Sequence, residues 1–341
     1  MRIGILTADE DWERTRTDPA AGHLAHSLER LAKTNDAVAT VLSAMGHETV
    51  WITVDATLVS RLEAANVDLV FDTYFGPGRR QDQAVVAALL EFAGTPFTGG
   101  GAACHYLGLS KPRSKRLFQA LHIPTPPFVD VAGLSVAPGL SIAAGLSVAA
   151  ALEAGAAIGF PLIVKTSAEG EGIGMDERSV ARTSDELLQA VDRLVGAFAE
   201  PPLIERFLPG REFTVGVLDA DPPVVLPILE LELGDATIYS YDAKVSGSAA
   251  DRCPAPLEEP LARAMGELAV RAGRAVECRD CWRVDFRMDA DGSPFVLEVN
   301  TLPGLMPGYS DLPKTAEAAG IDHAGLVAAI LASAERRRAA R

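Results

Sequence analysis

The sequence has few cysteines, few aromatic residues and fewer basic than acidic residues. Four cysteines among 341 residues fit free, reduced thiols. Aromatic residues make up only 6%, so we expect cores built from Ala, Val and Leu. The 31 Lys and Arg residues against 46 Asp and Glu give a net charge of -15, which repels nucleic acid and anionic membrane surfaces. Neither is expected as a partner.

Several catalytic signatures are also missing. The sequence has no GxSxG elbow of a serine hydrolase, no HExxH pattern of a zinc enzyme and no Walker A loop. Cys278 and Cys281 have CxxC spacing, but no second CxxC or His pair completes a zinc site, so we interpret them as structural. The chain enters the apolar run Ile3–Leu6 without the features of a signal peptide, so a cytoplasmic protein is expected.

Short apolar runs alternate with helical patterns in the first hundred residues. This alternation predicts an α/β domain with a parallel sheet and crossover helices. A helix with one apolar face is expected at Glu258–Val276. The expected strands are Ile3–Leu6, Val50–Val54, Leu69–Phe71, Pro96–Thr98, Phe160–Lys165, Leu203–Phe207, Glu212–Leu218 and Val224–Leu233.

Residues 131–152 carry no charged side chain, and an uncharged run of this length raises the question of a membrane span. The run contains three hexads that begin Gly-Leu-Ser, at residues 133, 139 and 145. Gly and Ser in every hexad, together with Pro138, oppose a stable spanning helix, and three short repeats are too few for a solenoid. We interpret the stretch as a linker or insertion between domains.

The segment Arg283–Asn300 predicts a β-hairpin. Asp291-Gly292 is a strong signal for a two-residue type I′ turn, and that turn fixes which residues oppose each other. Asp285 then faces Glu298, and Arg283 faces Asn300. The other side of the hairpin is wholly apolar, with Val284, Phe286 and Met288 opposite Val299, Leu297 and Phe295.

The polar side of this hairpin indicates a cation site. Like charges directly opposite each other destabilise a sheet, so Asp285 and Glu298 fit best around a hard cation. Two carboxylates and the amide oxygen of Asn300 suit Mg²⁺, which usually takes nucleotide phosphates as further ligands. The turn at Pro303-Gly304 would bring backbone N–H groups near the same site, where they could hold an oxyanion. The alternative is a surface hairpin with a solvated polar face.

A second candidate site begins at Lys165, which ends an apolar run. Gly170, Gly172 and Gly174 follow it and predict a loop whose backbone could cover phosphates. Taken alone this signal is weak, because a glycine-rich surface loop would give the same pattern.

The order of these motifs resembles the D-alanine–D-alanine ligase branch of the ATP-grasp superfamily, over nearly the whole chain and most densely after Gly99. The resemblance implies a three-part fold that combines α/β and α+β parts. These are an N-terminal parallel-sheet domain at residues 1–110, a small central subdomain at 111–207 with the repeat linker at 131–150, and a C-terminal mixed-sheet subdomain at 208–341. It also implies ATP and Mg²⁺ as cofactors, with ATP between the last two parts.

Segments along the chain match the ATP-binding motifs of this family. Leu109–Lys115 and Phe160–Lys165 resemble the two segments that each carry an ATP lysine. Leu203–Thr214 resembles the stretch with one acid beside the adenine and one at the ribose, and Tyr241–Lys244 the segment whose lysine approaches the γ-phosphate. By this resemblance the ATP-binding residues are Lys111, Lys165, Glu205, Glu212, Lys244, Gly170 and Gly172.

The hairpin matches the family's metal and oxyanion motifs. Asp285, Glu298 and Asn300 are implied to bind Mg²⁺. Arg283 and the backbone of Gly304 are implied to stabilise the tetrahedral intermediate. Lys244 joins them among the catalytic residues by its place at the transferred phosphoryl group.

The match is weaker at the substrate contacts. Glu29 has the spacing of the family's glutamate for the ammonium of the first amino acid, although an exposed helical glutamate would look the same. Glu171 and Tyr309 stand where serines are expected, and Val245 where a tyrosine is expected. Phe75 takes the place of a histidine. The departures at Glu171, Val245 and Tyr309 predict that the substrates are not two D-alanines.

We therefore expect an ATP-dependent ligase that activates a carboxylate as an acyl phosphate and joins it to an amine. Its partners are expected to be amino-acid-like small molecules of a specialised biosynthetic pathway. The alternatives are a genuine D-alanine–D-alanine ligase of cell-wall synthesis, an ATP-grasp enzyme that uses no external amine, and a non-catalytic nucleotide-binding protein. The oligomeric state stays open, with a homodimer as one option.

The hexads at 133–150 are predicted to be dispensable for chemistry, because they contain no titratable side chain. Deleting one hexad should leave ATP turnover within about a few-fold of the parent, since loops tolerate changes of length at small entropic cost. Steady-state ADP release measures this. Complete loss of turnover in a folded deletion variant would show instead that the stretch lines the site.

Overall fold

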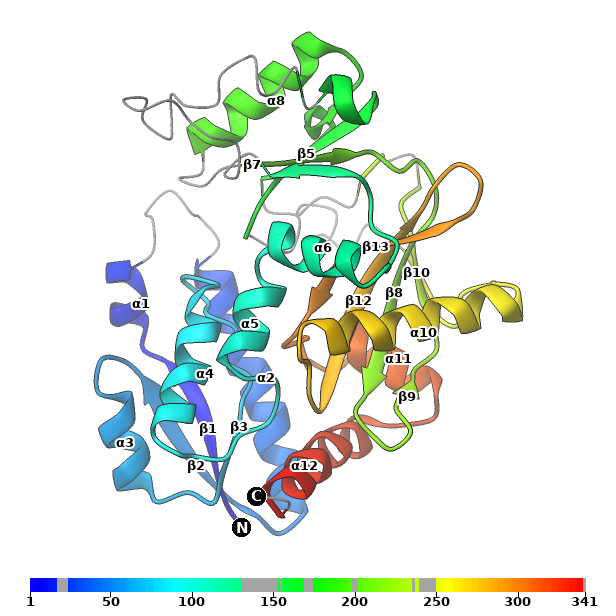
Figure 1. Cartoon of the computed structure of the whole chain (residues 1–341). Coiled ribbons are helices and arrows are strands. Elements are labelled where there is room, and N and C mark those ends of the chain that lie inside the picture. The colour runs from blue at the N-terminus through cyan, green and yellow to red at the C-terminus, as the bar shows by residue number, and fades with distance from the viewer. Residues whose placement is uncertain are drawn as a thin grey trace.

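The computed structural model describes residues 1–16, 24–130, 153, 155–168, 174–197, 202–234, 237–238 and 250–339. Three β-sheets follow one another along the chain, and helices cover each of them (Figure 1). The Gly-Leu-Ser hexads lie outside the described residues, so the linker interpretation stays a prediction. The domain boundaries at 110 and 207 are likewise predictions.

The first sheet is parallel, with strand order β2-β1-β3, as the sequence predicted. The expected fourth strand at Pro96–Thr98 is reduced to a single parallel bridge between Val70 and Phe97. The strands and helices of this part are β1 (Arg2–Ala8), α1 (Glu10–Arg16), α2 (Leu24–Ala44), β2 (Glu48–Val54), α3 (Leu58–Ala65), β3 (Leu69–Phe71) and α4 (Asp82–Phe92).

Alternating side chains of β1 and β3 enter two different cores. Ile3 and Ile5 pack with Leu69 and Phe71 on the face that also holds α2, whereas Leu6 and Val70 pack toward α3 and α4. Both faces are therefore covered, which is the usual condition of a parallel sheet. In sheets of this kind, ligands usually bind at the carboxyl ends of the strands.

The second sheet has four antiparallel strands in the order β4-β7-β5-β6, with α8 packed on one face. Leu162, Val164 and Ile204 of the sheet meet Leu187 and Leu194 of the helix. The elements that lead into and form this part are α5 (Ala102–Gly108), α6 (Lys111–Ala120), β4 (Phe128–Asp130), β5 (Leu162–Thr166), the 3₁₀ helix Glu177–Ser179, β6 (Val180–Ala181), α8 (Ser184–Ala197) and β7 (Pro202–Arg206).

The third sheet is antiparallel, with the order β11-β10-β8-β12-β13 and the short β9 paired to β8. The expected strand Val224–Leu233 is split into β9 and β10. The helix predicted at Glu258–Val276 is confirmed as α10, with these two residues as its caps. The elements are β8 (Glu212–Leu218), β9 (Val224–Val225), β10 (Leu229–Glu232), β11 (Ala250–Arg252), α10 (Glu259–Ala275), β12 (Cys281–Met288), β13 (Pro294–Asn300), α11 (Asp311–Ala318) and α12 (His323–Ala339).

The two faces of the third sheet have different neighbours. Apolar side chains of β8, β12 and β13 pack with Met265 and Ala272 of α10 on one face. Helix α11 crosses the other face at Gly216, where an added Cβ would lie 2.7 Å from a methyl carbon of Leu312. Glycine is needed here because the helix approaches the strand so closely.

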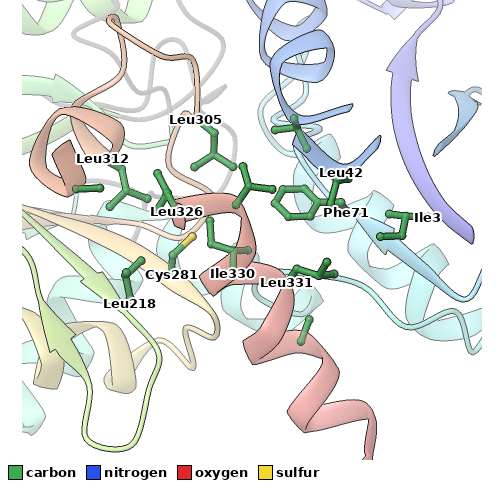
Figure 2. Packing of buried hydrophobic residues seen from close by; sticks show 14 of the residues in the cluster. Ile3, Leu42, Phe71, Leu218, Cys281, Leu305, Leu312, Leu326, Ile330 and Leu331 are labelled. Atoms are coloured by element: carbon green, nitrogen blue, oxygen red, sulfur yellow. The ribbon is translucent and has the colours of Figure 1, made fainter. Parts of the chain in front are cut away.

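Helix α12 joins the first and third sheets into one core. Leu326, Ile330 and Leu331 of this helix pack between Phe71 of the first sheet and Leu218 of the third (Figure 2). Arg337 near the end of α12 pairs with Asp280 and donates a hydrogen bond of 2.9 Å to the carbonyl of Phe97. The N-terminal sheet is therefore attached to the rest of the protein by apolar packing as well as by charge.

No single helix in the described part of the chain is long and apolar enough to cross a membrane. Helices α11 and α12 meet the length and composition criteria only as a pair, and they are bent by 104° relative to each other. Their apolar residues, such as Leu312 and Ile330, are buried in the shared core.

Candidate functional site

A cleft that is partly open to solvent lies where the first sheet meets the second and third. Its walls are formed by residues in or next to five strands and three helices. These elements are β3, β5, β8, β12, β13, α2, α6 and the start of α11. Its polar lining residues are Arg30, Thr34, Asp72, Thr73, Arg80, Gln83, Lys111, Lys165, Thr166, Glu212, Thr214, Arg283, Asp285, Glu298, Asn300, Ser310 and Asp311.

The β12–β13 hairpin confirms the predicted pairing next to this cleft. Arg283 pairs with Asn300, and Asp285 pairs with Glu298. The predicted turn is wrong, because a type I′ turn needs positive φ at both central residues and only Gly292 has it. The turn instead has three residues between Asp289 and Ser293, with a hydrogen bond of 2.9 Å from the amide of Asp289 to the carbonyl of Ser293.

A β-bulge at Leu297 compensates for the longer turn. Phe286 pairs with Val296, and the next pair is Asp285 with Glu298, so Leu297 is the extra residue. The predicted pairs of Phe286 with Leu297 and of Met288 with Phe295 are therefore wrong. Leu297 lines the cleft beside Glu298 instead of joining the apolar side.

Asp285 is surrounded by hydrogen-bond donors. Arg283 donates to both of its oxygens, at 3.0 and 3.1 Å. The hydroxyl of Thr214 donates to Oδ1 at 2.6 Å, and the amide nitrogen of Asn300 donates to Oδ2 at 2.9 Å. These contacts hold the carboxylate in one orientation and leave the side-chain oxygen of Asn300 available to a ligand.

Glu298 is partly buried and still ionised. The ammonium of Lys111 lies 3.3 Å from its Oε2. Burial alone would raise the pKa of Glu298, but Lys111, Arg80, Lys165 and Arg283 together lower it to about 2. The hairpin therefore presents a fixed negative charge to the cleft.

Arg283 binds a second carboxylate on its other side. Its Nη1 donates to Oδ2 of Asp311 at 2.9 Å, while Nε and Nη2 engage Asp285. A guanidinium has five N–H groups, so these three bonds leave two for a substrate. Burial works against the charged form of Arg283, but Asp285 and Asp311 outweigh it and raise its pKa.

A buried ionic triad connects α6 with the second sheet. The carboxylate of Glu205 pairs with Lys165 of the neighbouring strand and lies 2.9 Å from the ammonium of Lys115. Lys115 also donates to the hydroxyl of Thr125 at 2.8 Å. The side chains of Lys115 and Glu205 are each only 1% exposed. Burial raises the pKa of Glu205, but the two lysines outweigh it and lower the value overall.

A smaller pocket lies beside this triad and shares Lys165 and Glu212 with the large cleft. Apolar side chains of Ile163, Phe207 and Leu297 line it. Glu212 accepts a hydrogen bond of 3.1 Å from Arg287. Burial raises the pKa of Glu212, and Arg287 opposes that rise. The pocket is thus an apolar slot with both acidic and basic side chains on its wall.

Some expected substrate residues lie away from the cleft. The side chain of Glu29 is 60% exposed, and its carboxylate pairs with Lys33 at 2.7 Å. From the same helix, Arg30 lines the cleft, with its guanidinium over the rings of Phe75 and Tyr309 at 5.1 and 5.9 Å. Ser310, and not Tyr309, lines the wall at that end. Tyr309 packs against Arg30 behind this wall, and its expected role at the substrate stays a prediction.

Five of the expected site residues fall outside the described part of the chain, namely Lys244, Gly170, Gly172, Glu171 and Val245. Their roles stay predictions. Gly304 is described and lies in the cleft wall, where an added Cβ would come within 2.6 Å of the hydroxyl of Ser310.

Sequence reasoning missed several residues that the fold brings to the site. Lys115 follows Lys111 by four residues, so a helical reading of that segment could have placed both on one face. Thr214, Asp311 and Asp72 come from elements far apart in the sequence, and no local pattern marks them.

The CxxC pair is split between two cores. Cys278 is buried with its sulfur 3.8 Å from that of Cys104, whereas Cys281 belongs to the core shared with α12. Burial raises the pKa of both thiols. This packing agrees with the structural interpretation of the two cysteines.

A family model described as the D-ala D-ala ligase C-terminus matches residues 117–332. The chain is 31% identical over 328 residues to a D-alanine–D-alanine ligase of Pelotomaculum thermopropionicum, an alignment that covers 96% of this chain and 94% of that protein. It is 36% identical over 302 residues to a D-alanine–D-alanine ligase of Stutzerimonas stutzeri, with 88% of each chain covered.

The fold also matches a solved structure. The crystal structure of D-alanine–D-alanine ligase from Bacillus anthracis in complex with ATP superimposes with a TM-score of 0.72 and 22% identity. The match covers 99% of this chain and 98% of that one. At this identity the likeness establishes the ATP-grasp fold.

Replacing Lys115 with Met should destabilise the protein by about 3–5 kcal/mol, because Glu205 would keep only one of its two cationic partners in a buried site. The free energy of unfolding in urea measures this. The matched control is Lys33→Met, which removes a lysine from an exposed pair and should leave stability unchanged. Equal stabilities of the two variants would contradict a structural role for the triad.

Proposed function

The chain belongs to the D-alanine–D-alanine ligase family of ATP-grasp enzymes, which are ATP-dependent ligases that form C–N bonds, and on that basis we propose a specific reaction. The protein activates the carboxylate of one amino-acid-like substrate as an acyl phosphate and joins it to the amine of a second. The observation that carries this proposal is the polar face of the β12–β13 hairpin. This face lines the cleft that also contains Lys111, and its residues are Arg283, Asp285, Glu298 and Asn300.

ATP lies between the second and third sheets in this proposal. The slot lined by Ile163, Phe207 and Leu297 suits the flat aromatic faces of adenine. Glu212 on its wall suits the ribose hydroxyls. Lys111 and Lys165 at the junction with the large cleft suit the phosphates, and they supply positive charge locally in a chain whose net charge is -15. Lys244, Gly170 and Gly172 are proposed for the same phosphates by family resemblance.

The hairpin has the ligand chemistry that Mg²⁺ needs. Asp285 and Glu298 are neighbouring carboxylates on one face, and the low pKa of Glu298 keeps it charged. The side-chain nitrogen of Asn300 bonds to Asp285, which leaves the side-chain oxygen of Asn300 for a ligand. All three are hard oxygen ligands. We assign Mg²⁺ to these residues, where it would neutralise charge on the ATP phosphates.

The reaction itself requires positioning and charge more than covalent participation by the protein. A carboxylate oxygen of the donor attacks the γ-phosphorus, and the bond to the leaving ADP breaks. The acceptor nitrogen then attacks the carbonyl carbon, phosphate leaves, and the amine proton passes to solvent. Lys111 and Lys165 offset the phosphate charge. The remaining N–H groups of Arg283 and the backbone near Gly304 stabilise the oxyanion.

The substrates are proposed to differ from two D-alanines. Asp311 lies in the cleft and occupies one side of Arg283. By the family resemblance, Glu171 and Val245 replace a serine and a tyrosine that contact the first substrate. Phe75 stands where the family resemblance leads one to expect a histidine, and the exposed Glu29 lies outside the cleft. A specialised biosynthetic pathway fits such altered contacts.

Changing Glu298 to Gln should lower ADP release by about 100-fold or more, because one charged ligand is lost from the metal site. The apparent affinity for Mg²⁺ should fall as well. Glu267→Gln, an exposed position on α10, is the matched control and should keep parent activity. Near-parent turnover of a folded Glu298→Gln protein would refute the metal assignment.

With D-alanine as the only amino acid, ADP release should be slow compared with the best pair from a panel of L- and D-amino acids. Each unpaired polar contact costs about 1–3 kcal/mol, which corresponds to roughly a 5- to 150-fold loss of rate per contact. Coupled-enzyme detection of ADP and mass spectrometry of the product measure this. Formation of D-alanyl-D-alanine faster than the product of any other pair would overturn the substrate proposal.

A further inference from the structure

Asp72 is a buried acid that the reaction described above does not use. It directly follows β3, at the carboxyl end of the first sheet, where parallel sheets place their ligands. Its side chain is only 2% exposed, yet it belongs to the lining of the large cleft. The N-terminal domain thus contributes a carboxylate to the substrate side of the cleft.

One oxygen of this carboxylate lacks a partner. Oδ1 accepts a hydrogen bond of 2.9 Å from the amide of Tyr74. Oδ2 is buried and has no hydrogen-bond partner among the residues that the structure describes. Burial raises the pKa of Asp72 to about 7, and the amide of Tyr74 only partly opposes that rise. A buried oxygen without a partner is costly unless a ligand supplies the missing contact.

The polar groups next to Asp72 bond to one another. Thr73 donates to the side-chain oxygen of Asn35, and the amide nitrogen of Asn35 donates to the carbonyl of Leu6 at 2.8 Å. These hydrogen bonds bring no second carboxylate to Asp72. One carboxylate suits an organic cation better than a metal ion, which takes several oxygen ligands.

The chemistry of the reaction indicates which cation this is. The acceptor amine must lose its charge before it can attack, so a carboxylate that stabilises ammonium would hinder it. The amine of the carboxylate donor does not react and can stay protonated throughout. Glu29, which family resemblance assigns to that ammonium, points to solvent and pairs with Lys33.

We propose that Asp72 binds the protonated amine of the carboxylate-donating substrate and thereby selects amino acids over simple carboxylic acids. This inference rests on the proposed function and names one specificity determinant within it. The ammonium completes the contacts of Oδ2. The donor carboxylate is then held toward the hairpin, where its activation takes place.

The test uses Asp72→Asn, which keeps the shape of the side chain and removes its charge. Hydroxylamine serves as the amine, so that only the donor half of the reaction is compared, and alanine of either hand is tested against propionate as donor. In the variant, the ratio of kcat/KM for alanine to kcat/KM for propionate should fall by about ten-fold or more, because the KM for alanine rises. Its KM for ATP should stay unchanged. Asp36→Asn, an exposed position on α2, is the matched control and should keep the parent preference.

Glu29→Gln is the competing variant, and its effect on the preference should be smaller than that of Asp72→Asn. A loss of preference in Glu29→Gln together with a parent-like Asp72→Asn protein would overturn the inference. If Asp72→Asn lowered the activity with alanine and with propionate equally, this would also overturn the inference, since it would indicate a general structural role.

A measurement without substrates separates this inference from the proposed function. If no donor supports ADP release in the parent protein, the proposed function fails by itself. Urea unfolding at pH 8.5 then still tests Asp72, because an acid kept for a ligand is not stabilising in the free protein. The Asp72→Asn protein should have a midpoint equal to or above that of the parent. A lower midpoint would show that Asp72 serves the fold and would contradict its role in binding.

Discussion

One extra residue in β13 decides which face of the third sheet carries the site. Without the bulge at Leu297, the register set by the three-residue turn would place Glu298 opposite Val284, on the apolar face that packs against α10. A shift of one residue moves a side chain to the other face of a sheet. The bulge therefore brings Glu298 beside Asp285, and the convergence of carboxylates in the cleft depends on it.

Carboxylates brought together in this way need cations, and the cations come from other elements. Lys111 begins α6 and reaches Glu298, while Lys165 of the second sheet lowers the pKa of the same carboxylate. Arg283 bridges Asp285 and the first residue of α11. The charges that prepare the site for an anionic nucleotide thus also connect the second and third sheets. We infer that nucleotide binding and the relative arrangement of the second and third sheets are coupled through these ion pairs.

The sequence predicted the polar and apolar sides of the hairpin because alternation along a strand is a local property. It predicted the pairs at the site correctly although the turn was wrong, because the longer turn and the bulge shift the register in opposite directions. The bulge itself has no sequence signal that periodicity could detect. Asp311 and Asp72 could not be found either, since their place in the cleft depends on how α11 and the first sheet pack. Glu29 has the expected spacing, but the orientation of its helix turns it to solvent.

The central claim is that a carboxylate is activated by phosphorylation in this cleft, and an isotope measurement tests it most directly. The donor amino acid is labelled with oxygen-18 in its carboxylate, and the phosphate released during amide formation is analysed by mass spectrometry. Activation through an acyl phosphate transfers one carboxylate oxygen to phosphorus, so the account predicts one labelled oxygen in each phosphate that is released. Unlabelled phosphate accompanying amide formation would contradict it.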